Sequence, residues 1–503
     1  MDGIVSITDM SFSYRDWLSS RADALCPPVL SHVDLALEDG SMTLILAPPD
    51  AGKTTLARIL AGLIPKYMDG ALSGTVMVDG HDLSKTEPWE LVHCCGYVSQ
   101  NPLDELIAPT CEDEIAFPLE SLGMPRYEII RHVRAALEAW GLVSMREASA
   151  QELSGGERKR LLLAVQDAVD PKVWILDESF DDLDVSWRER LMDRISSRSN
   201  TSVVFGSRYL DEFHGTFDRY GLLAGGRLSF GDEADIALEF ERLCETPYAA
   251  SASKSVPGFI PVSDAAGCGR SVMPLHVMER EGKEHRLSCT DVSAVHMRRS
   301  MVQERPFTLS VPRFSLLGGE VVSLCGPNGS GKSTFSRLLC GLDLPLAGTF
   351  SLDDDVASRT VLNRSVGYLF QNPDYQIFLP TVKEELAWSL KRAKIPQREI
   401  DRRVGECADL FHLDLDETPS TMSFGLRKSL QAATYYLLDR PFYILDELDS
   451  ALTYATAFDL VNLLRHNGAG ILLITHDRRF ADALADRNYT ISDGLLSEAE
   501  EGA

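Results

Sequence analysis

The stretch Gly326-Pro-Asn-Gly-Ser-Gly-Lys332-Ser-Thr334 has the composition and spacing of a phosphate-binding loop. Its glycines let the backbone turn N–H groups onto a phosphate, its lysine reaches the terminal phosphates, and the next hydroxyl binds Mg²⁺. A second, imperfect copy lies at Ala47-Pro-Pro-Asp-Ala-Gly52-Lys53-Thr-Thr55. Two such loops predict two nucleotide sites, and their inequality predicts that the sites do different work.

The loops belong to a longer internal repeat. Gln100, Ser154 and Asp177 of the first copy are matched 271, 269 and 269 residues later by equivalent motifs, and Lys53 is matched by Lys332 after 279 residues. Near-constant offsets across four motifs indicate a duplicated domain.

We therefore predict a first domain over residues 1–245, a linker over 246–285 and a second domain over 286–503. The linker region is rich in alanine, serine, proline and glycine and lacks a sustained apolar period.

Each copy is predicted to have an α/β fold with a mixed sheet core and a helical subdomain. Short apolar runs at Met42-Thr-Leu-Ile-Leu46 and Val321-Val-Ser-Leu-Cys325 end at the phosphate loops and read as strands. The helix after each loop should direct its N-terminus at the phosphates. The expected helices cover residues 56–63, 127–140, 335–342 and 398–411.

Composition restricts the functional classes. The chain has 503 residues and a net charge of −26, which argues against a nucleic-acid-binding surface. Its ten cysteines include no CxxC pair, and the adjacent Cys94 and Cys95 cannot form a zinc knuckle alone, so we expect reduced, packed thiols. No apolar run is long enough to cross a bilayer, and the N-terminus does not resemble a signal peptide.

The order of the motifs carries a specific resemblance. Each phosphate loop is followed by a Gln-Asn-Pro loop, a serine-containing signature and an apolar strand ending in Asp-Glu, seen as Leu153-Ser-Gly-Gly-Glu157 and Ile444-Leu-Asp-Glu447. The chain resembles a tandem pair of ATP-binding cassette (ABC) ATPase domains over nearly its whole length. Two P-loop ABC nucleotide-binding domains are the fold that this resemblance implies.

A narrower resemblance lies after the Gln loops. Gln371-Asn-Pro-Asp-Tyr-Gln-Ile-Phe378 precedes Thr381-Val-Lys-Glu-Glu-Leu-Ala387, and related stretches begin at Gln100 and Thr110 in the first copy. This pattern is similar to the ATPases of energy-coupling factor (ECF) importers, which take up vitamins, vitamin precursors and transition-metal ions. The fused tandem ATPase of a sugar-type importer is the alternative within the transporters.

The resemblance implies a role for each matching residue. Glu447 polarises the attacking water, His476 contacts the γ-phosphate and Gln371 senses the metal and the γ-phosphate, with Glu178 as the first copy's counterpart of Glu447. Mg²⁺, the implied cofactor, would be held by Ser333, Gln371 and Asp446 in one copy and by Thr54, Gln100 and Asp177 in the other.

ATP-binding positions follow in the same way. In the second copy they are Gly326, Pro327, Asn328, Gly329, Ser330, Gly331, Lys332, Ser333 and Thr334. In the first copy they are Ala47, Pro48, Pro49, Asp50, Ala51, Gly52, Lys53, Thr54 and Thr55, with Tyr14 as the candidate for stacking on adenine. His296 is the weaker candidate for adenine stacking in the second copy. The signature residues are Ser154, Gly155, Gly156, Ser423 and Gly425.

Four departures from the family pattern converge on one site. Ala47 replaces the first loop glycine, Arg208 or Ser207 stands where a histidine is expected, Phe424 replaces a signature glycine, and Thr453 replaces an aspartate. In an intramolecular head-to-tail ABC dimer, each ATP lies between the phosphate loop of one domain and the signature of the other, so all four departures meet. The other composite site matches the pattern throughout.

The resemblance implies an ATPase on the cytoplasmic face of the cell membrane. Its expected partners are ATP, a transmembrane coupling subunit and a substrate-binding membrane subunit, with no nucleic acid. A soluble tandem-ABC translation factor acting on ribosomes is the competing class, but such proteins usually carry charged linkers and basic surfaces. A DNA-repair cassette would need inserted zinc modules, which the cysteine pattern does not offer.

Overall fold

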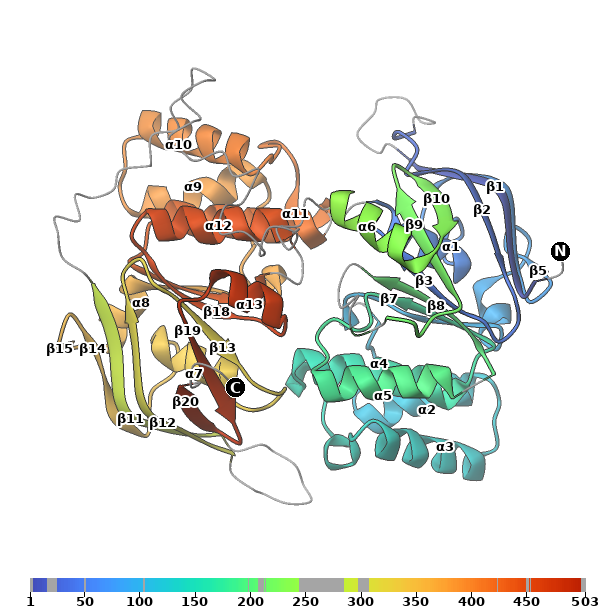
Figure 1. The fold of residues 1–503 in the computed structure, drawn as a ribbon, viewed down its shortest axis with the longest axis horizontal. Helices are drawn as coiled ribbons and strands as arrows, with labels where there is room; N and C mark the ends of the chain where they lie inside the picture. The colour runs from blue at the N-terminus through green and yellow to red at the C-terminus, as the bar shows by residue number, and fades with distance from the viewer. Residues whose placement is uncertain are drawn as a thin grey trace. The chain divides into compact units, whose positions relative to one another are not determined.

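The computed structural model describes residues 3–15, 25–48, 51–102, 105–197, 199–206, 212, 214–243, 285–296, 307–422, 424–448, 452 and 454–498. These residues form two compact units, which we call unit 1 (up to residue 243) and unit 2 (from residue 285). Figure 1 shows unit 1 in blue to green and unit 2 in yellow to red. Most of the predicted linker, residues 246–284, lies outside the described residues.

Unit 1 contains two sheets. A four-stranded antiparallel sheet has the order β2-β1-β4-β5, and a six-stranded sheet has the order β10-β9-β3-β8-β7-β6, parallel except at the β10 edge. The strands are β1 (Val5–Tyr14), β2 (Leu30–Leu37), β3 (Met42–Leu46), β4 (Gly70–Val78), β5 (His81–Asp82), β6 (Cys95–Val98), β7 (Val173–Asp177), β8 (Thr201–Gly206), β9 (Arg219–Ala224) and β10 (Arg227–Gly231).

The helices of unit 1 divide between two apolar cores. Helix α1 (Lys53–Leu60) packs in a core with the four-stranded sheet, whereas α2 to α5 share the core on the other face of the six-stranded sheet. Figure 1 shows α2 and α3 beside α4, as expected for a helical subdomain. Their bounds are α2 (Cys111–Ser121), α3 (Arg126–Ala139), α4 (Gly155–Val169), α5 (Val185–Ser196) and α6 (Glu233–Leu243).

Unit 2 repeats the same strand order in one ten-stranded sheet, β15-β14-β11-β12-β20-β19-β13-β18-β17-β16. A bridge between Ser310 and Leu495 joins its antiparallel and mainly parallel parts. The strands are β11 (Arg286–His296), β12 (Phe307–Leu317), β13 (Val321–Cys325), β14 (Ala347–Leu352), β15 (Asp355–Val356), β16 (Val366–Leu369), β17 (Phe442–Asp446), β18 (Gly470–Ile474), β19 (Arg487–Ser492) and β20 (Leu495–Glu498).

The α-helices of unit 2 are α7 (Lys332–Leu339), α8 (Arg359–Ser365), α9 (Val382–Arg392), α10 (Gln397–Leu410), α11 (Phe424–Leu438), α12 (Tyr454–His466) and α13 (Arg478–Leu484). They match those of unit 1 only in part, because α8 and α13 have no α-helical counterpart among the described residues of unit 1. None of the helices in the described ranges combines the length and apolar character that a bilayer crossing requires.

The predicted α/β fold class and the two strands before the phosphate loops are confirmed. The predicted helices after the loops are displaced. They begin at Lys53 and Lys332, three residues earlier than expected, and end at Leu60 and Leu339. A glycine with positive φ, Gly62 or Gly341, follows each helix closely and explains its early end.

Candidate functional site

The phosphate loop of unit 2 is built for close backbone approach. It joins β13 to α7, and Gly326 adopts a φ of 151°, where an added Cβ would collide with the carbonyl oxygen of Ile491. Lys332 donates to the carbonyl oxygens of Gly326 at 2.6 Å and Pro327 at 3.2 Å. The buried Ser330 hydroxyl has no hydrogen-bond partner among the described residues, so it suits a ligand with acceptor oxygens.

The loop of unit 1 differs at its first residue. Ala47 has no positive φ, and its N–H donates to the carbonyl of Gly206 at 3.2 Å. Lys53 keeps the folded-back contact, donating to the Ala47 carbonyl at 3.0 Å. Pro49 and Asp50 lie outside the described residues. The substitution of glycine by alanine therefore accompanies a different backbone conformation, not only an added methyl group.

In unit 2 the predicted catalytic residues converge at the end of β17. Gln371 donates to one carboxylate oxygen of Glu447 at 2.7 Å, and Nε2 of His476 lies 3.5 Å from the other. Asp446 accepts from the hydroxyl of Tyr368 at 2.7 Å. Burial raises the pKa of the Asp446 carboxyl, and the Tyr368 hydrogen bond and nearby lysines oppose that shift.

In unit 1 the equivalent glutamate contacts the phosphate-loop lysine, while the equivalent aspartate keeps a tyrosine partner. Glu178 forms an ion pair with Lys53 at 2.6 Å, and both side chains are nearly buried. Asp177 accepts from the Tyr97 hydroxyl at 3.2 Å. Burial raises the pKa of the Asp177 carboxyl, and the Thr54 hydroxyl is near enough to oppose the shift.

Both glutamates share an unusual backbone conformation. Glu178 and Glu447 have φ values of 49° and 46°, in the left-handed region that non-glycine residues rarely adopt. The N–H of each donates to the next strand, to Phe205 at 3.0 Å and Ile474 at 2.9 Å. Strain of this kind persists where the surrounding structure imposes it and is concentrated at functional sites.

The oxygen donors of both units fit a hard divalent cation. Asp177 Oδ1 is buried and makes no hydrogen bond of normal geometry within the part of the chain that the structure describes. The Ser333 hydroxyl is exposed on the first turn of α7, and Asp446 ends the adjacent β17. Carboxylate and hydroxyl oxygens suit Mg²⁺, which neutralises charge on the β- and γ-phosphates when bound with ATP.

The two signatures begin their helices differently. Ser154 is the N-cap of α4, and its reciprocal hydrogen bonds with Glu157 form a capping box. Helix α11 begins at Phe424, and Leu426 stands where unit 1 has Glu157, so its side chain cannot complete a capping box. Gly155 and Gly425 lie in the first turns of these helices.

Sequence reasoning missed a buried lysine behind each Gln loop. Lys159 donates to the carbonyls of residues 99–100 at 2.9 and 2.8 Å, and Lys428 donates to those of 370–371 at 2.6 and 2.9 Å. Both lysines are fully buried. They occupy the same position relative to the signature in each copy, and this repeated spacing is the signal that could have identified them.

A buried glutamate supports the loop beyond each Gln motif. Glu114 accepts from the N–H groups of Ile107 and Ala108 at 2.9 and 2.6 Å. In unit 2, Glu385 accepts from the N–H groups of Phe378 and Leu379 at 3.1 and 2.8 Å. The offset of 271 between the two glutamates matches that of the Gln motifs, which again was a readable signal.

The remaining predicted positions are only partly described. The hydroxyl of Tyr14 lies 3.0 Å from that of Thr55, which places this aromatic beside the phosphate loop; its stacking on adenine stays a prediction. Gln100 is half-buried at its loop. The sites predicted at Ser207, Arg208, Ser423 and Thr453, and the side chain of His296, lie outside the described residues.

Comparison with protein families gives a match to the ABC transporter family over residues 30–181 and 309–450, together more than half of the chain. The chain is 29% identical to "Putative ABC transporter ATP-binding protein" of Methanosarcina mazei, across 98% of this chain and 88% of that protein. It is 28% identical to "Putative HMP/thiamine import ATP-binding protein YkoD" of Bacillus subtilis, across 99% of this chain and 91% of that protein.

Among solved structures, this chain is similar to an ATP-binding subunit of an ABC transporter, with 24% sequence identity and a TM-score of 0.37. The matched region covers 43% of this chain and 90% of that subunit. The structure of cbiO1 from Clostridium perfringens, part of the ABC transporter complex cbiONQ, is 22% identical with a TM-score of 0.36. It covers 43% of this chain and 88% of that chain.

Proposed function

The chain belongs to the ABC transporter family of ATP-hydrolysing subunits, and we propose that it is the energy-coupling ATPase of an ECF-type importer. Its cargo would be a vitamin, a vitamin precursor or a transition-metal ion. The relative named for HMP/thiamine import matches this chain over nearly its whole length and supports the same class. In this proposal the protein acts at the cytoplasmic face of the membrane through membrane-spanning partners.

The observation that carries the proposal is a pair of exposed apolar positions beyond the Gln loops. Ile107 is 72% exposed and Phe378 is 64% exposed, at matching places in the two units. Phe117 and Trp388, also at matching places, are exposed on the following helices, and Phe378 contacts Trp388 edge to face. Exposed apolar groups at repeated positions suit docking of a protein partner.

The backbone at these positions is held by hydrogen bonds. The carboxylates of Glu114 and Glu385 fix the backbone at Ile107 and Phe378 through paired N–H groups, as described above. The same loops continue from Gln100 and Gln371. A partner seated on Ile107 and Phe378 would therefore be linked mechanically to both ATP sites, as coupling of hydrolysis to transport requires.

The two units are proposed to form a head-to-tail dimer with two composite ATP sites. One site combines Lys332, Glu447 and His476 with the intact signature at Ser154. The other combines Lys53 and Glu178 with the signature altered at Phe424, whose benzyl group would crowd a phosphate where glycine allows close approach. The first supplies most turnover, and the second binds ATP and supports closure.

The docking proposal is tested by purifying the tagged chain from detergent-solubilised membranes. We expect a multispanning membrane protein to co-purify, and Ile107→Ser together with Phe378→Ser to remove it while ATP binding is retained. Leu346→Ser is the matched control, because Leu346 is 73% exposed but lies in another part of unit 2. Co-purification with ribosomes, unaffected by the double substitution, would favour the translation-factor class and contradict the proposal.

A further inference from the structure

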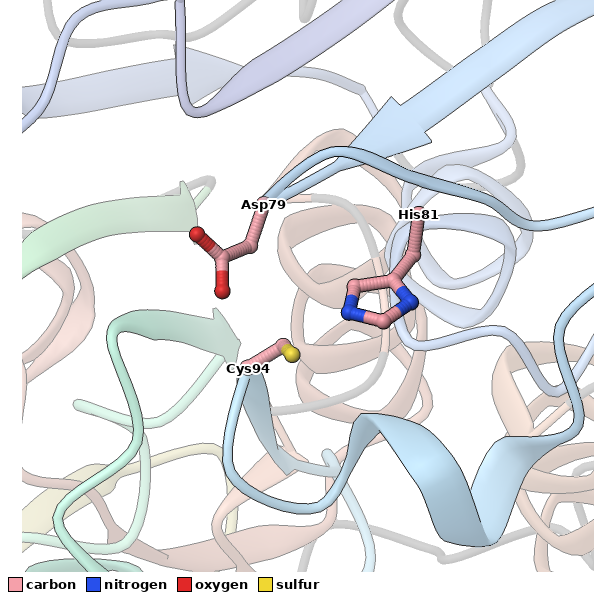
Figure 2. A group of neighbouring side chains, drawn as sticks. All are labelled: Asp79, His81 and Cys94. Atoms are coloured by element: carbon pink, nitrogen blue, oxygen red, sulfur yellow. The ribbon is translucent and has the colours of Figure 1, made fainter.

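Unit 1 contains a cluster of metal-ligating side chains away from its ATP site. The thiol of Cys94, the imidazole of His81 and the carboxylate of Asp79 place one ligand atom each within 4.8 Å of one another. Figure 2 shows the three side chains facing a common space from two different segments of the chain. The sequence predicted only a packed thiol here, because the cysteines form no CxxC pair and the adjacent Cys94 and Cys95 cannot form a zinc knuckle alone.

The backbone fixes all three positions. Val78 pairs with His81 across β4 and β5, and Asp79 and Gly80, with φ values of 48° and 78°, form the two-residue turn between them. Cys94 lies before β6, and its backbone bonds to Leu91 at 2.8 Å and to Val173 at 2.9 Å. The ligands are therefore held by a tight hairpin and by a sheet edge.

We propose that Asp79, His81 and Cys94 bind a zinc ion that cross-links the two sheets of unit 1. Thiolate, imidazole and carboxylate together are a ligand set that Zn²⁺ favours, with Zn–S near ~2.3 Å and Zn–N near ~2.0 Å. Three protein ligands leave the fourth tetrahedral position to water. The ligand atoms, which lie within 4.8 Å of one another, would have to move closer together by side-chain rotation to reach those distances.

The local charges are compatible with this ion. Burial raises the pKa of the Cys94 thiol, and the neighbouring Asp79 carboxylate raises it further while Lys172 opposes the shift, so zinc binding would displace the thiol proton. Lys172 contacts the Asp79 oxygens at 2.7 and 3.0 Å, but its side chain is 60% exposed. A carboxylate has enough lone pairs to bind the ion and keep this exposed lysine.

Unit 2 provides an internal comparison. Leu352 pairs with Asp355 as Val78 pairs with His81, so Asp353 and Asp355 stand in the places of Asp79 and His81. Ser365 precedes β16 as Cys94 precedes β6, and Asp353 instead contacts His285 at 2.9 Å. The zinc ligand set is thus confined to unit 1 among the described residues.

The test uses the full-length protein, treated with chelator and titrated with Co²⁺ without nucleotide. We expect one Co²⁺ per chain with a thiolate-to-cobalt charge-transfer band, and displacement of that band by Zn²⁺. Cys94→Ser should abolish the band and His81→Asn should weaken binding at least about ten-fold. Cys26→Ser changes a partly exposed cysteine elsewhere in unit 1. This variant should keep both the charge-transfer band and the Co²⁺ affinity of the wild-type protein.

ATP binding by each variant checks that it is folded, and the charge-transfer band separates this site from cations bound with nucleotide by oxygen ligands. Lys172→Gln should tighten Zn²⁺ binding several-fold, because it removes a positive charge from beside the ion. No cobalt band in the wild-type protein, or a band that survives Cys94→Ser, would overturn the proposal. Weaker binding by Lys172→Gln would also contradict the arrangement.

Discussion

Unit 1 and unit 2 hold the same glutamate in the same strained backbone conformation but give it different partners. Glu178 is paired with the phosphate-loop lysine Lys53 at 2.6 Å. Glu447 accepts a hydrogen bond from Gln371 at 2.7 Å and lies 3.5 Å from His476. The Glu178 carboxylate thus lies in a nearly buried ion pair with a phosphate-loop lysine, whereas the Glu447 carboxylate lies beside the amide and the imidazole of the predicted catalytic set.

The two units share the contacts that support the fold and differ in several groups of the ATP site. Both units keep the positive φ at the glutamate and a buried lysine behind the Gln loop. In both, a tyrosine hydroxyl also donates a hydrogen bond to the aspartate before the glutamate. They differ in the loop's first residue, in the signature and in the glutamate's partners. Duplicated domains that retain the fold-supporting contacts while losing some chemical groups are expected where one site still has to bind ATP.

The largest expected effect comes from removing each glutamate in turn. Glu447→Gln should lower ATPase kcat by about 100-fold or more, because the amide cannot act as a base towards the attacking water. Glu178→Gln should change kcat by less than about two-fold if its site contributes little turnover, as we propose. Steady-state ATPase assays of the two variants, purified in parallel, measure the difference.

Restoration provides the control for that experiment. In the Glu447→Gln background, Ala47→Gly, Arg208→His, Phe424→Gly and Thr453→Asp together should recover part of the activity by repairing the degenerate site. ATP binding by both single variants must be retained. Equal losses from Glu447→Gln and Glu178→Gln would show that the two sites share the hydrolysis and would end the distinction between the units.

The buried lysines should give an intermediate effect. Lys428→Met and Lys159→Met each leave two loop carbonyls without their donor, at a cost of about 1–3 kcal/mol in stability. We expect similar falls in thermal stability, measured by circular dichroism. If the Gln loop of unit 2 serves the site with most of the turnover, as we propose, ATPase activity should fall about ten-fold only for Lys428→Met.

A different outcome would be informative in a specific way. If both lysine variants lose stability and activity together, the lysines support the fold of their own unit and do not position Gln371 selectively. Lys428→Arg keeps a donor at this position. In that case it should restore thermal stability and ATPase activity to the same extent.

Much of this site could be predicted because its residues lie in short sequence motifs next to strand ends. Asp446 ends β17 and Lys332 begins the helix after β13, and the motif order places phosphate loop, Gln loop and carboxylates on one edge of a parallel sheet. The strands before the phosphate loops followed from their apolar runs, whereas the mixed sheet was predicted with the family resemblance. The helices after the loops were placed three residues late, because the periodic apolar residues begin after the first turn.

Contacts between distant segments could not be predicted. The repeat marks the position of Lys159, but its charged neighbourhood in the sequence indicates neither that it is fully buried nor that it reaches a loop about 60 residues away. Cys94 meets Asp79 only because the β4–β5 turn lies over the start of β6. Long-range neighbours of this kind depend on packing, which local patterns do not encode.

The smallest expected effect concerns the tyrosines that hold the metal-site aspartates. Tyr368 donates to Asp446 at 2.7 Å, and Tyr97 donates to Asp177 at 3.2 Å. The hydrogen bond from Tyr368 lowers the pKa of Asp446, so Tyr368→Phe should raise that pKa and weaken Mg²⁺ binding by about 0.5–1.5 kcal/mol. The Mg²⁺ concentration for half-maximal ATPase should rise a few-fold, and the acidic limb of the pH profile should move to higher pH. Tyr97→Phe should leave both curves unchanged if unit 2 holds the active site, whereas equal shifts from the two substitutions would mean that both aspartates serve turnover.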